Sequence, residues 1–195
     1  MKKILLAVLT ACSLISAHAT LFQYSVTLDG PSEFPVNASP GTGTGSVNYD
    51  DVAHSLQLQV SFSGLLAGVT ASHIHGPTTA PFSQNAGVAT TTPTLAGFPS
   101  GVTSGSYANT LDLTLASSYN PSFVTASGGT TAGAEAALAA AMAAGKAYWN
   151  IHSSSFPGGE IRGFLVPEPS SLALVGLGAV CIAARVWSKR RANKS

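Results

Sequence analysis

The chain has 195 residues, of which 45% are hydrophobic and 9% are charged. Most of its cations lie near the two ends. Residues 20–166 keep only Lys146 and Arg162 against seven acidic residues, a formal charge of −5. Such a segment cannot form the basic surface that binding of nucleic acid requires. Both cysteines, Cys12 and Cys181, lie outside it, which excludes an internal disulfide and cysteine-ligated zinc there.

Met1–Ala19 has the features of a secretory signal peptide. It begins with two lysines, continues with an apolar run over Ile4–Ala11 and ends in Ala17-His18-Ala19. This pattern predicts cleavage after Ala19 by signal peptidase. The alternative is a lipoprotein signal, because Leu9-Thr10-Ala11-Cys12 resembles a lipobox that would place a lipid on Cys12.

Alternation of apolar and polar residues predicts strands over Phe22–Leu28, Ser55–Phe62 and Tyr107–Leu113. A period of two with one polar face is typical of an antiparallel sheet that covers a core on one side. Glycine-rich segments such as Gly41–Gly45 are interpreted as turns. Residues 76–105 are interpreted as long surface loops, with one short strand at 87–91.

Ala134–Ala144 contains eight alanines and predicts a helix. Leu138 and Met142 give it a narrow apolar stripe, and Glu135 is expected in the first turn, where the helix dipole favours an acid. Many short strands with one crossover helix indicate a mainly β domain. The expected fold is an immunoglobulin-like or Greek-key antiparallel β-sandwich.

Two segments carry most of the histidines. His73 and His75 flank Ile74, and residues i and i+2 of a strand point to the same face. The second segment, Lys146–Leu165, is predicted to form a hairpin that contains His152.

The register of this hairpin follows from its apolar residues. Pairing Ile151 with Ile161 and Trp149 with Gly163 places the apolar side chains on one face, and a slip of one residue would put Arg162 on that face. The Trp149 ring is expected to lie over Gly163. The other face then pairs Asn150 with Arg162 and His152 with Glu160.

Two interpretations of these polar residues remain open. One is a structural hydrogen-bonded network formed by Asn150, Glu160 and Arg162. The other is a copper or zinc site with nitrogens from His73, His75 and His152 and with Glu160 or water as fourth ligand. No nucleophile elbow, pair of carboxylates or phosphate-binding loop accompanies them, so no catalytic residue is assigned and a non-enzymatic protein is expected. His54 is expected to be solvated.

The C-terminal segment 167–195 has three parts in order. Pro167-Glu168-Pro169 is followed by the apolar run Leu172–Ala184, a predicted short transmembrane helix, and then by five cations. The basic end should remain cytoplasmic, which places residues 20–166 across the membrane. The segment resembles the PEP-CTERM sorting signal of Gram-negative bacteria. The resemblance implies passage through the inner membrane, cleavage by an exosortase-type protease and delivery to the cell surface or extracellular matrix. An uncut single-pass anchor is the alternative.

The middle segment also resembles a known family. His73-Ile74-His75-Gly76-Pro77, then Tyr148–His152, then Phe156–Gly163 resemble the motifs of the CHRD (chordin-type) domain. This resemblance implies an extracellular β-rich module over residues 20–166. The His-x-His strand is also loosely similar to copper/zinc superoxide dismutase, although the dismutase zinc-loop residues, disulfide and fourth copper histidine have no counterpart here.

Three functions therefore remain as hypotheses. The first is a non-enzymatic structural or binding module exported to the cell surface. The second is a copper- or zinc-binding protein. The third is a module that binds exopolysaccharide, which the assignment of the domain's single tryptophan, Trp149, to the core face makes less favourable.

Overall fold

The computed structural model describes residues 21–168 of the chain. Within them, eight strands, one 3-10 helix (η1) and two α-helices follow one another. Their order is β1 (Leu21–Asp29), β2 (Thr42–Asp50), β3 (Ser55–Ser63), β4 (Val69–His75), β5 (Gly105–Asp112), η1 (Ala116–Ser118), α1 (Pro121–Ala126), α2 (Thr131–Ala143), β6 (Tyr148–Ser153), β7 (Ile161–Phe164) and β8 (Val166–Pro167).

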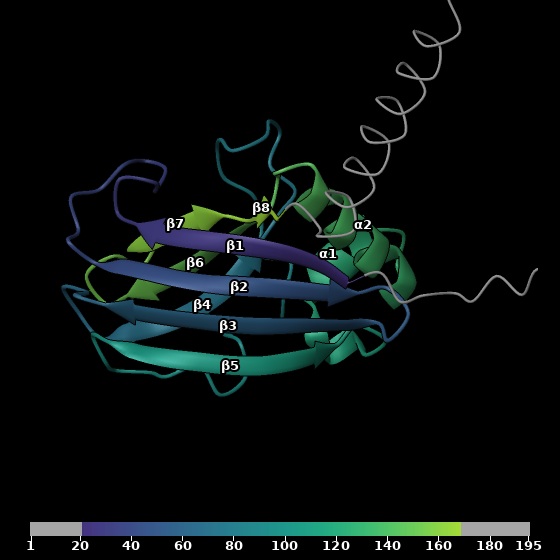
Figure 1. Ribbon diagram of the computed structural model, residues 1–195, viewed down its shortest axis with the longest axis horizontal. Helices are drawn as coiled ribbons and strands as arrows, with labels where there is room; N and C mark the ends of the chain where they lie inside the picture. Colours follow the sequence, from purple (N-terminus) through teal and green to yellow (C-terminus); the bar gives the residue numbers. More distant parts are fainter. Residues whose placement is uncertain (1–20, 169–195) are drawn as a thin grey trace, which may run out of the picture.

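The strands form one antiparallel sheet in the order β4-β6-β7-β1-β2-β3-β5, with β8 paired to β1. The sheet curls into a half-barrel, so that β4 and β6 lie behind β2 and β3 in Figure 1. Because of this curl, the ring centroids of Tyr107 on β5 and Trp149 on β6 are 6.5 Å apart. The mainly β, antiparallel prediction is confirmed. The two separate sheets of an immunoglobulin-like sandwich are not seen, because β1 pairs with both β2 and β7 and joins the two halves.

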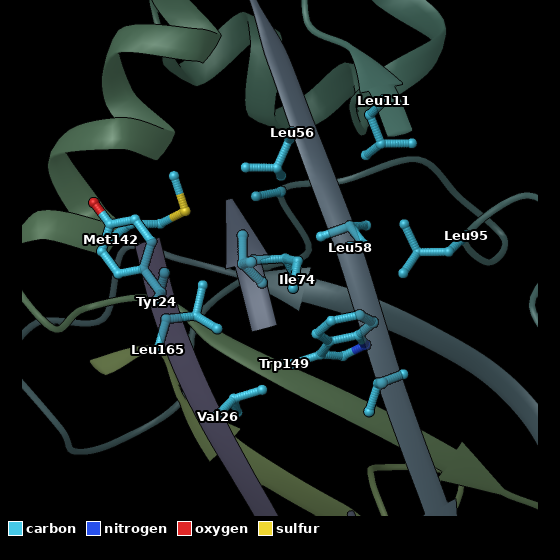
Figure 2. Close-up of a cluster of buried hydrophobic side chains, with 14 of the residues drawn as sticks. Tyr24, Val26, Leu56, Leu58, Ile74, Leu95, Leu111, Met142, Trp149 and Leu165 are labelled. Carbon is cyan, nitrogen blue, oxygen red and sulfur yellow. The ribbon is translucent and has the colours of Figure 1, made fainter. Parts of the chain in front are cut away.

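The inner face of the curled sheet holds the hydrophobic core. Along β3 the apolar residues are buried and the glutamines between them are exposed, as the alternation predicted. Figure 2 shows Leu56 and Leu58 of β3 among Ile74, Trp149 and Met142, which come from β4, β6 and α2. All five side chains are fully buried. Burial of one large apolar side chain stabilises a fold by about 1.5–3 kcal/mol, so this cluster is a main source of stability.

The glycine-rich segment before Val47 is not a turn. Thr42–Gly45 forms the first half of β2, and the alternation continues through it with Thr44 exposed. A Cβ atom at Gly45 would overlap the carbonyl oxygen of Gln59 in β3. The glycines therefore serve the close approach of two strands, and the prediction of a turn was wrong for this reason.

Two helices lie between β5 and β6. The Ala-rich helix α2 begins at Thr131, three residues before the predicted start, because the Thr130 side chain accepts a hydrogen bond from Gly133 N and caps it. Helix α1 was not predicted. Asn120 caps it and Pro121 is its first residue, which is a common helix-start signal.

Glu135 lies beyond the first turn of α2, contrary to expectation, and its side chain is buried. Its carboxylate accepts a hydrogen bond from the Tyr49 hydroxyl at 2.9 Å, and each of its two oxygens lies 3.0 Å from Nδ1 of His54. His54 is therefore not simply solvated. It joins the turn between β2 and β3 to the helix.

The segment between β4 and β5 does more than form surface loops. Ala89 and Leu95 are fully buried in the core. Ala89 N donates to Ile74 O at 2.9 Å, and Leu95 N donates to Ser72 O at 3.0 Å. These bonds cover the free edge of β4, which would otherwise expose unpaired backbone groups. The strand expected at 87–91 is reduced to isolated bridges of Val88 and Thr90.

Strand β8 brings the beginning of Pro167-Glu168-Pro169 onto the sheet. Pro167 pairs with Tyr24 of β1, and Glu168 N donates to Gln23 O at 2.8 Å. The predicted signal peptide with its cleavage after Ala19, the residue Pro169 and the apolar run Leu172–Ala184 lie outside the described residues. From residue 21 to residue 168, no helix is both long enough and apolar enough to cross a membrane.

Candidate metal centre

Three histidines gather on the face of β4 and β6 that points away from the core. His73 pairs with Asn150 across the two strands, His75 pairs with Tyr148, and Ala71 pairs with His152. Ile74, Trp149 and Ile151 occupy the alternate positions and are fully buried in the core. The two-residue period of the strands therefore places all three imidazole rings together on the other face.

The rings of His73, His75 and His152 are close enough to share an ion. One candidate ligand atom from each lies within 4.8 Å of the other two. The ring centroids are 5.7 Å apart for His73 and His75, 5.4 Å for His73 and His152, and 5.9 Å for His75 and His152. The two histidine motifs, separated by about 75 residues in the sequence, thus meet in space.

Each ring is held by one nitrogen. The Nε2 of His73 lies 2.8 Å from Pro93 O, the Nδ1 of His75 lies 3.0 Å from Ala86 O, and the Nδ1 of His152 lies 3.0 Å from Pro157 O. A carbonyl oxygen only accepts, so each of these nitrogens carries the proton. The lone pair then belongs to the opposite nitrogen of each ring.

Those opposite nitrogens have no partner. Nδ1 of His73, Nε2 of His75 and Nε2 of His152 are buried and make no hydrogen bond. An unsatisfied buried polar atom costs about 1–3 kcal/mol, and here three occur in one cluster. Carbonyl oxygens that fix the tautomers of metal-ligating histidines are a regular feature of metal sites.

Burial keeps these imidazoles neutral. It lowers the pKa of His73 and of His152, and it lowers the pKa of His75 to about 4. The hydrogen bonds to the carbonyl groups oppose this shift in all three rings. Neutral imidazole is the form that binds a metal, so the rings need lose no proton to bind one at neutral pH.

Three neutral nitrogens suit zinc or copper among the common metal ions. Two ligands bonded at about 2.1 Å can be at most about 4.2 Å apart. The donor atoms here are separated by up to 4.8 Å, so the rings must move slightly together around an ion.

Glu160 does not join the histidines. It is fully buried, and its Oε1 accepts hydrogen bonds from Ser39 Oγ at 2.7 Å and from Leu66 N at 2.5 Å. Glu160 lies just before β7 and after Gly159, whose φ of 132° turns the chain. The strand alternation used to place Glu160 beside His152 therefore does not extend to it.

Arg162 also has partners other than Glu160. Its Nε donates to Ser32 O, and one terminal nitrogen donates to Gln84 O at 3.0 Å and to Asn85 Oδ1 at 2.6 Å. The guanidinium lies 4.8 Å from the ring centroid of Tyr148. Arg162 does face Asn150 across β6 and β7, as predicted, but the predicted network with Glu160 is replaced by contacts to loops.

The comparison with protein families agrees with this arrangement. The CHRD domain family matches residues 24–165, which include the three histidines and the hairpin. The chain belongs to the CHRD family. Searches of curated proteins and of solved structures gave no significant match.

A second family match follows the CHRD domain. The PEP-CTERM protein-sorting motif matches residues 165–191. This motif implies export, processing by an exosortase and sorting to the cell surface. The match overlaps β8, so the sorting signal begins while the chain is still paired with the sheet.

Sequence reasoning missed one buried acid of the CHRD domain, Glu33. It lies in the loop between β1 and β2 and is 5% exposed, and its Oε1 has no partner. Burial raises the pKa of its carboxyl to about 7, although the charge of Arg162 and a hydrogen bond with the Phe34 backbone oppose the shift. No period or motif marks this position, because it belongs to an irregular loop.

Proposed function

We propose that this CHRD domain is a non-enzymatic module that binds one zinc or copper ion through His73, His75 and His152 at the cell surface. The proposal is supported by one observation above all: in a cluster of three histidines, each ring has one buried nitrogen without a hydrogen-bond partner. A purely structural network would be expected to satisfy its buried nitrogens.

Metal analysis tests this proposal directly. The full chain, purified without chelator, is expected to hold about one equivalent of zinc or copper, since three histidines form one site. His73→Ala, His75→Ala and His152→Ala should each lose most of the metal. His54→Ala is the matched control, because His54 contacts Glu135 and not the cluster. Wild-type protein that binds neither ion at micromolar concentration would contradict the proposal.

We further propose that the exosortase cuts near Pro167-Glu168-Pro169 and releases the domain to the extracellular matrix. The match of the sorting motif to residues 165–191 supports this. Mass spectrometry of surface material should find the chain without Leu172–Ser195 and beginning after Ala19. An intact tail on the exported protein would favour a permanent anchor, and a lipid on Cys12 would favour the lipoprotein alternative.

A second candidate function is binding of exopolysaccharide. The outer face of β1, β2 and β3 carries hydroxyl and amide side chains in cross-strand rows, such as Ser25 beside Ser46 and Gln59. A shallow hollow on this face is lined mostly by threonines and serines, including Thr27 and Thr44, together with Gly43 and Phe62. Trp149 cannot act as a sugar platform, because it is fully buried. Retention of the chain on matrix polysaccharide, lost in Thr44→Lys, would support this function.

A further inference from the structure

Two buried oxygen atoms near the histidine cluster lack a hydrogen-bond donor. They are Asn150 Oδ1 and Glu33 Oε1, on side chains that are 3% and 5% exposed. Both lie beside Gly159. A Cβ atom added to Gly159 would lie 2.7 Å from Asn150 Oδ1 and 2.7 Å from Glu33 Oε1. The two oxygens therefore converge on one small region.

Asn150 connects this region to the histidines. It is the cross-strand partner of His73 and lies two residues before His152, so the amide and both rings share one face. Cross-strand partners have Cβ atoms about 4.5–5.5 Å apart. This register places Asn150 on the face of the sheet that holds the histidine cluster, next to His73.

A tetrahedral ion bound by three histidines keeps one open position, which water commonly fills. The two hydrogens of that water need acceptors. In a buried site, an acceptor without a donor is as unfavourable as a donor without an acceptor. We infer that a water molecule completes the metal shell and donates its hydrogens to Asn150 and Glu33, which act as positioning residues. This inference rests on the proposed metal-binding function.

The charges around the region are consistent with this role. Three neutral imidazoles bring no negative charge to a divalent cation, and Glu33 is the acid whose unpartnered oxygen converges with Asn150. Arg162 on β7 is the cation near Glu33, and contacts to Ser32 O, Gln84 O and Asn85 Oδ1 hold it. Tyr148 and Glu160 are further titratable groups here: burial raises the pKa of the Tyr148 hydroxyl, and the buried Oε2 of Glu160, the residue after Gly159, also lacks a hydrogen-bond partner.

Loading the full chain with cobalt(II) tests the inference, because its visible absorption reports the ligand geometry. Asn150→Ala and Glu33→Ala should each weaken cobalt and zinc binding by about 10–100-fold, the usual effect of removing an outer-shell partner. Both should also change the visible spectrum. Asn150→Asp keeps an acceptor oxygen and should retain binding. A merely structural role for Asn150 would not produce this difference between Ala and Asp.

Glu135→Gln is the matched control, since Glu135 is a buried acid in contact with His54 and Tyr49 rather than with the cluster. It should leave the affinity and the spectrum unchanged. If the wild-type chain binds cobalt and both Glu33→Ala and Asn150→Ala retain its affinity and spectrum, the inference is wrong and the metal site stands. If the folded wild-type chain binds no metal, the proposed function itself fails, and the inference with it.

Discussion

A Cβ atom on Gly163 would overlap the carbonyl oxygen of Thr27. Gly163 lies opposite Trp149, as the hairpin register predicted. The Trp149 ring was expected to fill the space above this glycine. Instead the backbone of β1 fills it, and the ring points into the core, where Nε1 donates to Ser72 Oγ at 2.8 Å. Gly163 therefore allows the close approach of β7 to β1, the pairing that joins the two halves of the sheet.

Replacing this glycine should destabilise the domain. In Gly163→Ala the new methyl group must push β1 and β7 apart, and we expect the free energy of unfolding to fall by about 3 kcal/mol. Chemical denaturation measures this change. Gly158→Ala in the nearby hairpin loop is the control, because no atom lies within 4 Å of the added methyl position. Equal midpoints for the two variants would show that β1 does not approach β7 so closely.

The metal-free domain should lose stability as the pH falls from about 6.5 to about 4. The pKa of His75 is lowered from 6.5 to about 4 in the folded chain, so only the unfolded chain takes up a proton in this interval. The free energy of unfolding therefore decreases with falling pH. His75→Asn should flatten this dependence in denaturation experiments with chelator present. An equally steep dependence in the variant would assign the proton uptake to other groups.

Glu33 should have the opposite dependence on pH. Its folded pKa of about 7 lies above the ordinary value of 4.5, so its contribution to stability is lost as the pH rises through 7. Glu33→Gln removes the buried charge, and at pH 8 it should stabilise the metal-free domain by about 1–3 kcal/mol. At pH 4.5 the two proteins should have the same stability. A variant that is less stable at both pH values would contradict this.

The link between Glu135 and His54 should matter for stability rather than for metal binding. Glu135→Ala leaves the buried Tyr49 hydroxyl without its acceptor, and we expect a loss of about 1–3 kcal/mol. His54→Ala should cost less, because the His54 side chain is 51% exposed. A double-mutant cycle measures the coupling between them, and a coupling energy of zero would show that the contact adds nothing.

The parts of the site that obey strand periodicity were predicted from sequence. His73 and His75 share a face because two residues span one strand repeat, and the hairpin register follows because a slip would bury Arg162 among apolar residues. The places of the two buried acids Glu160 and Glu33 were not predicted. Glu160 leaves the strand pattern after Gly159, and Glu33 reaches the region from a loop without any pattern.

The same distinction applies to the fold. Strand β3 alternates clearly and was predicted, whereas Thr42–Gly45 was interpreted as a turn because glycine on the inner face of a strand cannot be told from a turn signal by composition. The curl of the sheet depends on which strands become neighbours. Only the long-range pairing of β1 with β7 decides that, and periodicity carries no information about it.

The sorting motif begins in a strand, β8, that is paired with the sheet and could also detach from it. Pro167 is part of β8, and Glu168 N is bonded to Gln23 O of β1. A protease that binds its substrate as an extended chain needs those backbone groups free. For the proposed cleavage near Pro167-Glu168-Pro169, the terminal strand would first have to detach from β1 by local opening. The pairing of β8 with β1 would then slow this processing, and a variant that weakens the pairing would be processed faster.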